Sequence, residues 1–239
     1  MSTNIKLIIA YDGSNYFGWQ RTRSGPSIES TLQDVLEKIL GHSIELQAAS
    51  RTDRGVHAKG QVVNFFSDYQ DLNRLLYSAN SLLPPDIRIL SIDKAPTTFH
   101  PTLDCKGKVY TYTMSTKAPM PLERHTTWHY PYAVDLDQMR SCAKKCIGKK
   151  DFKAFTNACA NAPTDTVREI YSLEIDKSET TYTFTIYGNH FLYKMVRNLV
   201  GTLCDIGQGR IPPLLDVLSR KDLGVTAPAH ALVLDEIVY

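Results

Sequence analysis

The pattern of apolar and polar positions divides the first hundred residues into alternating strand-like and helix-like segments. Residues 5–13 (IKLIIAYDG) are rich in β-branched residues and close on an Asp-Gly turn, which predicts a strand. Residues 27–41 repeat apolar positions every three or four residues and predict a helix that begins after Ser27 and ends at Gly41. The same criteria predict strands over 43–50 and 61–67, a helix over 71–83 and a strand over 86–95.

The second half of the chain resembles this order of elements without repeating the sequence. The predicted elements are a strand over 108–116, a helix over 135–148 capped by Asp135, a strand pair over 167–188, a long helix over 191–207, a helix over 212–220 and a strand over 231–239. We therefore expect an α+β fold made of two ferredoxin-like, RNP-like subdomains with mainly antiparallel sheets. Pro101 and Gly107 interrupt the pattern, so the predicted subdomains are residues 1–105 and 106–239.

Composition places the chain among ordinary globular proteins, with 43% hydrophobic and 22% charged residues. The net charge of +2 permits a nucleic-acid partner without requiring one. The first residues lack the features of a secretory signal, and no apolar stretch reaches the roughly 20 residues of a membrane-spanning helix. We expect a soluble, cytoplasmic protein.

The five cysteines are scattered and odd in number, which favours reduced thiols over a disulfide framework. Cys142 and Cys146 lie one helical turn apart, but no nearby His or Cys pair completes a tetrahedral metal site, so core-facing cysteines are the better interpretation. Phosphate-binding, dinucleotide-binding, HExxH and GxSxG motifs are absent. We expect no cofactor and no metal.

The segment SRTDRGVHAKGQVV, residues 50–63, places Asp53 between Arg51 and Arg54 and between two predicted strands. Neighbouring positive charge keeps a carboxylate ionised, which suits a nucleophile or a base. Taken alone, the segment favours a charged turn with solvent-facing arginines, because Asp and Gly are common in turns. Histidine can serve as an acid or a base in catalysis, but a lone histidine before a strand, as at His57, is more often structural.

Three further segments carry residues suited to RNA contact or to packing. Tyr110 and Tyr112 project to the same face of a predicted strand, where aromatic rings can stack on bases or cover a helix. Arg197 lies on an apolar helix and needs either a carboxylate such as Asp53 or solvent around a snorkelling side chain. Residues 19–21 (Trp-Gln-Arg) follow a tight turn and predict an exposed aromatic and basic tip, with both nucleic-acid contact and packing of the Trp open.

Six motifs stand in an order that resembles the TruA family of tRNA pseudouridine synthases. They are YDGSNYFGWQ, SRTDRGVHAKGQV, NSLLPPDI, KVYTY, DFKAF and NHFLYKMVRNLVGTL, which together span residues 11–203. The resemblance implies an enzyme that isomerises uridine to pseudouridine in the anticodon stem-loop of tRNA, at tRNA positions 38, 39 and 40, without cofactor or metal. It also implies a homodimer and a central RNA-binding cleft between the two subdomains.

The matched motifs also imply roles for individual residues. Asp53 matches the catalytic aspartate, which attacks the sugar C1′ or removes a proton from C2′ of a flipped-out uridine; the sequence leaves both routes open. Tyr110 matches the active-site tyrosine, and Arg197 matches the basic residue that pairs with the aspartate. The expected substrate-binding residues are Arg51, Arg54, Trp19, Gln20, Arg21, His57 and Met195.

The sequence departs from the family pattern at Glu29, Arg54 and Thr102, where glutamine, alanine or lysine, and arginine are usual. These departures leave Asp53 and Tyr110 untouched and bear on substrate range and tRNA affinity. Two alternatives therefore stay open: a pseudouridine synthase for another RNA, and an RNA-binding or tRNA-folding protein on the same scaffold with weak catalysis.

Overall fold

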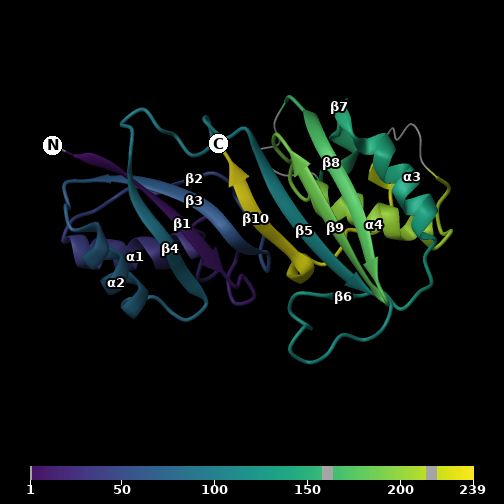
Figure 1. The fold of residues 1–239 in the computed structure, drawn as a ribbon, viewed down its shortest axis with the longest axis horizontal. Helices are drawn as coiled ribbons and strands as arrows, with labels where there is room; N and C mark the ends of the chain where they lie inside the picture. The colour runs from purple at the N-terminus through teal and green to yellow at the C-terminus, as the bar shows by residue number, and fades with distance from the viewer. Residues whose placement is uncertain (1, 158–163, 214–219) are drawn as a thin grey trace. The chain divides into compact units, whose positions relative to one another are not determined.

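The chain forms two compact units in the computed structural model, which describes residues 2–157, 164–213 and 220–239 (Figure 1). Unit 1 comprises the described residues up to Lys106 together with Leu234–Tyr239, and unit 2 comprises Gly107–Val233. Within each unit the strands pair mainly antiparallel and are accompanied by two helices, so the α+β class expected from the sequence is confirmed. The two units are described separately below.

Unit 1 follows the predicted order of two helices and strands. Its elements are β1 (Thr3–Tyr11), α1 (Ile28–Leu40), β2 (Gln47–Ala48), β3 (His57–Ser67), α2 (Leu72–Leu82) and β4 (Ile87–Ala95). The sheet order is β4-β1-β3, with β2 beside β3 and every one of these pairs antiparallel. Apolar side chains from β1 and α1 are fully buried and form the core: Ile5, Leu7, Ile9, Ile28, Leu32 and Leu36.

The first helix begins and ends where the sequence predicts. Ser27 accepts a hydrogen bond from Ser30 N, and the Ser30 hydroxyl in turn accepts from Ser27 N, so a reciprocal capping box closes the amino end of α1. Gly41 ends the helix, and its N–H donates to Glu37 O. Local sequence therefore determines both ends of α1, and the Asp71 side chain caps the amino end of α2 by accepting from Arg74 N.

The predicted strand over 43–50 is wrong in extent, because only Gln47–Ala48 pair as β2. Side chains of α1 satisfy the backbone before it: Gln33 Nε2 donates to Ile44 O at 2.8 Å, and Ile44 N donates to Glu37 Oε1 at 3.0 Å. A backbone whose polar groups are satisfied by a helix does not need a neighbouring strand.

Unit 2 carries the tyrosine strand and the long apolar helix. Its elements are β5 (Gly107–Ser115), β6 (Trp128–His129), α3 (Leu136–Cys146), β7 (Gly148–Asp151), β8 (Val167–Ser178), β9 (Thr181–Gly188) and α4 (Met195–Gly207), with short 3-10 turns at Lys153–Phe155, Arg220–Asp222 and Ala229–Ala231. The sheet order is β5-β9-β8-β7, antiparallel throughout, and β6 runs parallel to β5. Figure 1 shows α3 and α4 together on one side of this sheet, and the two helices pack on each other.

The long helix starts later than predicted, at Met195 and not at residue 191. Lys194 precedes it with a φ of 60°, in the left-handed region, so the right-handed helix cannot extend back through this residue. The helix predicted over 212–220 falls largely on residues 214–219, which lie outside the described residues.

The last strand corrects the predicted second subdomain, which ran to residue 239. β10 spans Leu232–Val238, and Leu234–Tyr239 belong to unit 1 because their contacts are there. Lys106 N donates to Val238 O at 2.8 Å, and Tyr239 OH donates to Pro101 O at 2.8 Å. Lys59 Nζ also lies 3.0 Å from Asp235 Oδ1.

Within the described ranges, four cysteines carry free thiols, at Cys105, Cys142, Cys146 and Cys204; Cys159 lies outside these ranges. Burial raises the pKa of the half-buried Cys146 thiol to about 11, so this side chain is neutral near pH 7. Among the residues that the structure describes, no group of three His, Cys, Asp or Glu side chains is arranged to hold a metal ion. No helix in the described part of the chain is long and apolar enough to cross a membrane.

Candidate active site

Asp53 lies half-buried on the loop between β2 and β3, at the first position of a tight turn. Val56 N donates to Asp53 O at 3.1 Å, which closes the turn. Gly55 occupies its third position with a φ of 80°, a conformation that side-chain-bearing residues rarely adopt. The turn expected from the sequence is therefore present, and it holds the aspartate at a defined point of the backbone.

A second loop, residues 12–19, packs directly against this turn. Trp19 N donates to Thr52 O at 3.0 Å. A Cβ on Gly18 would lie 2.6 Å from the same Thr52 oxygen, and a Cβ on Gly13 would overlap Val56 O. The two backbones therefore touch on both sides of Asp53, and only glycine allows that approach.

Buried polar side chains hold the loop from beneath. The Tyr11 and Thr52 hydroxyls are 2.8 Å apart and hydrogen-bonded. Gln61, which is fully buried on β3, brackets Ser50: its Oε1 accepts from Ser50 N at 3.2 Å, and its Nε2 donates to Ser50 O at 2.5 Å. The residues before Asp53 are thus bonded to β1 and β3, so the loop is preorganised.

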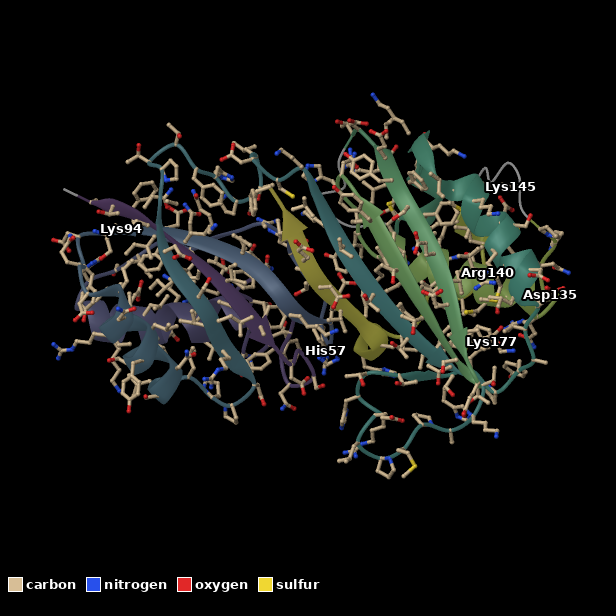
Figure 2. All side chains as sticks on the ribbon, in the orientation of Figure 1. His57, Lys94, Asp135, Arg140, Lys145 and Lys177 are labelled. Atoms are coloured by element: carbon tan, nitrogen blue, oxygen red, sulfur yellow. The ribbon has the colours of Figure 1, made fainter. Side chains whose placement is uncertain are left out.

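His57 is buried at the start of β3, next to the end of β1, where Ala58 pairs with Tyr11 (Figure 2). Its Nδ1 lies 3.1 Å from Gly13 N and 3.0 Å from Asp12 Oδ1. Nδ1 accepts from Gly13 only when it carries no proton and donates to Asp12 only when it does, so the two contacts belong to different protonation states. In either state His57 joins the two loops, which favours a structural role over the expected contact with substrate.

The exposed aromatic tip expected at residues 19–21 is wrong for Trp19. Its side chain is 2% exposed, and its ring lies 6.4 Å from that of Tyr11, so it packs inside unit 1. Gln20 and Arg21 are exposed as expected. Both are held on α1, since Gln20 Nε2 and Arg21 N donate to the Glu29 carboxylate at 2.7 and 2.6 Å.

The two arginines of the motif are both exposed, and one of them has an aromatic partner. The Arg54 guanidinium lies 4.3 Å from the centre of the Phe17 ring. A guanidinium over an aromatic ring is held by a cation–π contact, and its N–H donors suit a phosphate. The Arg54 side chain, where the sequence departs from the family pattern, is therefore held in position by Phe17. The sequence alone did not reveal this contact.

The other two departures from the family pattern have structural partners in unit 1. Glu29 receives the two bonds from Gln20 and Arg21. Thr102 Oγ1 donates to Ala48 O at 2.9 Å, and Ala48 lies two residues before Ser50.

In unit 2, Tyr110 and Tyr112 lie on the same buried face of β5, as the alternation predicts. The Tyr110 ring meets that of Phe191 edge-to-face, with centres 5.3 Å apart. Tyr112 is fully buried, and its hydroxyl donates to Pro228 O at 3.0 Å. Burial raises the pKa of Tyr112 well above its usual value, so packing is the better interpretation for this tyrosine.

Arg197 and Met195 lie in the first turn of α4 in unit 2. Arg197 Nε donates to Ala227 O at 2.8 Å, and Ala227 N donates back to Arg197 O at 3.1 Å. The Arg197 side chain is therefore held at Nε, next to the guanidinium carbon. Met195 is 0% exposed, so its expected contact with substrate is not supported.

Comparison with known proteins gives matches over nearly the whole chain. The family model described as tRNA pseudouridine synthase matches residues 7–103 and 142–239. "tRNA pseudouridine synthase A 2" of Protochlamydia amoebophila is 50% identical over 246 residues, covering 99% of this chain and 94% of that protein. "tRNA pseudouridine synthase A" of Thermoanaerobacter sp. is 38% identical over 243 residues, covering 99% of both proteins.

Among solved structures, the archaeal box H/ACA sRNP Nop10-Cbf5 complex matches with a TM-score of 0.38 and 14% identity, over 84% of this chain and 43% of the matched one. This similarity is too low to bear on function. The sequence relatives are far closer, and the family model covers both the Asp53 loop and the Arg197 helix. The chain therefore belongs to the tRNA pseudouridine synthase family, here the TruA branch of it.

Proposed function

We propose that this protein isomerises uridine to pseudouridine in tRNA, with Asp53 as the catalytic carboxylate. The observation that carries the proposal is the Asp53 loop itself. Its backbone touches Gly13 and Gly18 directly, and buried side chains bond it at Ser50 and Thr52. A carboxylate needs this degree of fixation to act on one bond of one nucleotide.

The reaction detaches uracil from the ribose, rotates it and rejoins it through C5. Asp53 attacks the sugar C1′ or removes the C2′ proton, and either step requires an ionised carboxylate beside the glycosidic bond. The target nucleotide has to leave the stem first, at a cost of a few kcal/mol in stacking and pairing. Arg51 and Arg54 are exposed beside Asp53 in the chain and can hold the backbone of the flipped nucleotide.

Two residues of unit 2 complete the proposed machinery. Tyr110 supplies an aromatic platform for the uracil and assists removal of the C5 proton. Arg197 stands where the family's motifs have the basic partner of the catalytic aspartate. Both roles follow from the match of this chain to the family's motifs, and both side chains are held by neighbours, Phe191 and Ala227.

We further propose the anticodon stem-loop as substrate, with tRNA positions 38, 39 and 40 as targets, and a homodimer that shares one tRNA between its subunits. Mapping pseudouridines in tRNA from cells with and without the gene tests the substrate. Loss of carbodiimide-reactive uridines at these positions alone is the expected result. Loss at other tRNA positions or in ribosomal RNA overturns the assignment, and an unchanged map favours a binding protein.

The dimer is tested by sedimentation of the purified protein with and without a tRNA transcript. A dimer at micromolar concentration is expected. A monomer that retains full turnover contradicts the sharing of one tRNA by two subunits.

Replacing Arg54 with alanine is expected to weaken tRNA binding without slowing the bound reaction. If the guanidinium over the Phe17 ring meets one phosphate, its loss should reduce the slope of log K against log salt concentration by about one in magnitude and raise Kd about tenfold or less. Filter binding at several salt concentrations and single-turnover kinetics measure the two effects.

Phe17→Leu is the matched control, since it keeps the cation and removes its aromatic support. It should give a smaller loss of affinity with the salt slope unchanged. An Arg54→Ala protein with wild-type affinity and slope would show that Arg54 does not meet the RNA backbone.

A further inference from the structure

Residues 224–227 of unit 2 cross α4 in direct contact with it. Each of the four residues donates a hydrogen bond to a residue of the helix. The bonds run from Gly224 N to Thr202 Oγ1 at 3.3 Å, from Val225 N to Asp205 Oδ2 at 2.9 Å, from Thr226 Oγ1 to Asn198 Oδ1 at 2.6 Å and from Ala227 N to Arg197 O at 3.1 Å. We call residues 224–227 the crossing segment.

The crossing segment ends at the carbonyl that holds Arg197. Ala227 O accepts from Arg197 Nε at 2.8 Å. Of the five N–H groups of a guanidinium, this bond uses the single one on Nε, and the remaining four stand on the two terminal nitrogens. Arg197 can therefore bind a carboxylate only through those terminal nitrogens. The direction in which they point depends on the position of Ala227 O, which holds Nε.

Thr226 is the side chain that joins the crossing segment to its surroundings at this point. Its hydroxyl donates to Asn198 Oδ1 and accepts from Arg220 Nη2 at 2.8 Å. Asn198 is fully buried, and its Nδ2 donates to Phe155 O at 2.7 Å and to Asn157 Oδ1 at 2.9 Å. The position of Thr226 is thus fixed by two other parts of the chain.

We infer that Thr226 is a positioning residue for Arg197, acting through the adjacent carbonyl of Ala227. If the Thr226 hydroxyl is removed, Asn198 Oδ1 loses this donor inside the unit. The crossing segment then loses its side-chain hydrogen bond nearest to Ala227. The guanidinium then samples several orientations. The inference rests on the proposed role of Arg197 in the reaction.

Two measurements on the purified full-length protein test this inference. The first is hydrogen exchange at the Arg197 Nε–H, followed by nitrogen-15 NMR and assigned by its disappearance in Arg197→Lys. In Thr226→Val we expect exchange at least about tenfold faster, the change that follows loss of one hydrogen-bond contribution. Thr226→Ser keeps the hydroxyl and should exchange at the wild-type rate.

The second measurement is turnover on tRNA. Thr226→Val should lower kcat about tenfold to a hundredfold with KM within about twofold, because the misplaced group acts in the chemical step. Thr226→Ser should restore kcat. Thr226→Ala removes the same hydroxyl without the added methyl group of Val, and serves if Thr226→Val melts well below the wild type.

Thr166→Val is the matched control. The Thr166 hydroxyl also donates to a side-chain oxygen at 2.6 Å, that of Asp151 Oδ1 in unit 2, and this bond involves no residue of the crossing segment. This variant should leave both Nε–H exchange and kcat at wild-type values.

Unchanged Nε–H exchange in Thr226→Val and Thr226→Ala overturns the inference, whatever the activity. Faster Nε–H exchange with a normal kcat in these variants also overturns the inference, since a more mobile Arg197 would then have no effect on turnover. If the wild type makes no pseudouridine, the proposed function fails, while the exchange measurement still decides whether Thr226 positions Arg197.

Discussion

Asp53→Asn should abolish pseudouridine formation and leave tRNA binding nearly intact. The amide has the size of the carboxylate but cannot attack C1′ or remove the C2′ proton, so we expect turnover to fall on the order of 10⁴-fold, as when a catalytic nucleophile is removed. The bonds that shape the loop, from Trp19 N to Thr52 O and from Val56 N to Asp53 O, come from the backbone and remain. Single-turnover kinetics and filter binding measure the two effects.

Asp93→Asn is the matched control, because it makes the same chemical change at an exposed position of β4. It should keep wild-type turnover. Normal turnover in Asp53→Asn would remove the residue from catalysis, and the family match would then have to be explained by another carboxylate. A joint loss of turnover and binding would mean that the loop itself had changed shape.

The ends of α1 and α2 could be predicted from the sequence because their caps are local. Ser27 and Asp71 each meet a backbone N–H within the first turn that follows. The strand over 43–50 could not, since Gln33 and Glu37 satisfy Ile44 from a helix whose packing only the fold determines. The late start of α4 rests on one left-handed residue, Lys194, which no apolar pattern reveals.

For the site, the motif and its order identified Asp53, and the structure adds what holds it. Gly13 and Gly18 stood in a quoted motif, yet only the fold shows that both touch the Asp53 loop. Trp19 and Met195 were expected to meet RNA and are buried. An isolated aromatic residue after a turn carries no periodicity, so the side that Trp19 faces could not be predicted, whereas Met195 belongs to the apolar pattern of the helix predicted over 191–207.

Gly201→Ala is expected to destabilise unit 2 strongly, against what helix propensity predicts. Alanine is favoured over glycine by about 1 kcal/mol inside a helix. At Gly201, however, the new Cβ would overlap Val225 O, a backbone atom of the crossing segment that cannot rotate away. Overpacking costs typically 1–3 kcal/mol and more where backbone must move, so the net loss should be roughly 3 kcal/mol. Urea unfolding followed by circular dichroism measures it.

The control for this substitution is Gly209→Ala, two residues past the end of α4. No atom of the described residues lies within 4 Å of a Cβ built there, and the φ of 78° adds backbone strain. That strain costs about 1–2 kcal/mol. A smaller loss at Gly201 than at Gly209 would mean that the crossing segment yields to the methyl group. The segment would then be too compliant to hold Ala227 O, and Arg197 would need another anchor. A larger loss at Gly201 indicates that α4 and residues 224–227 form one rigid support for the arginine.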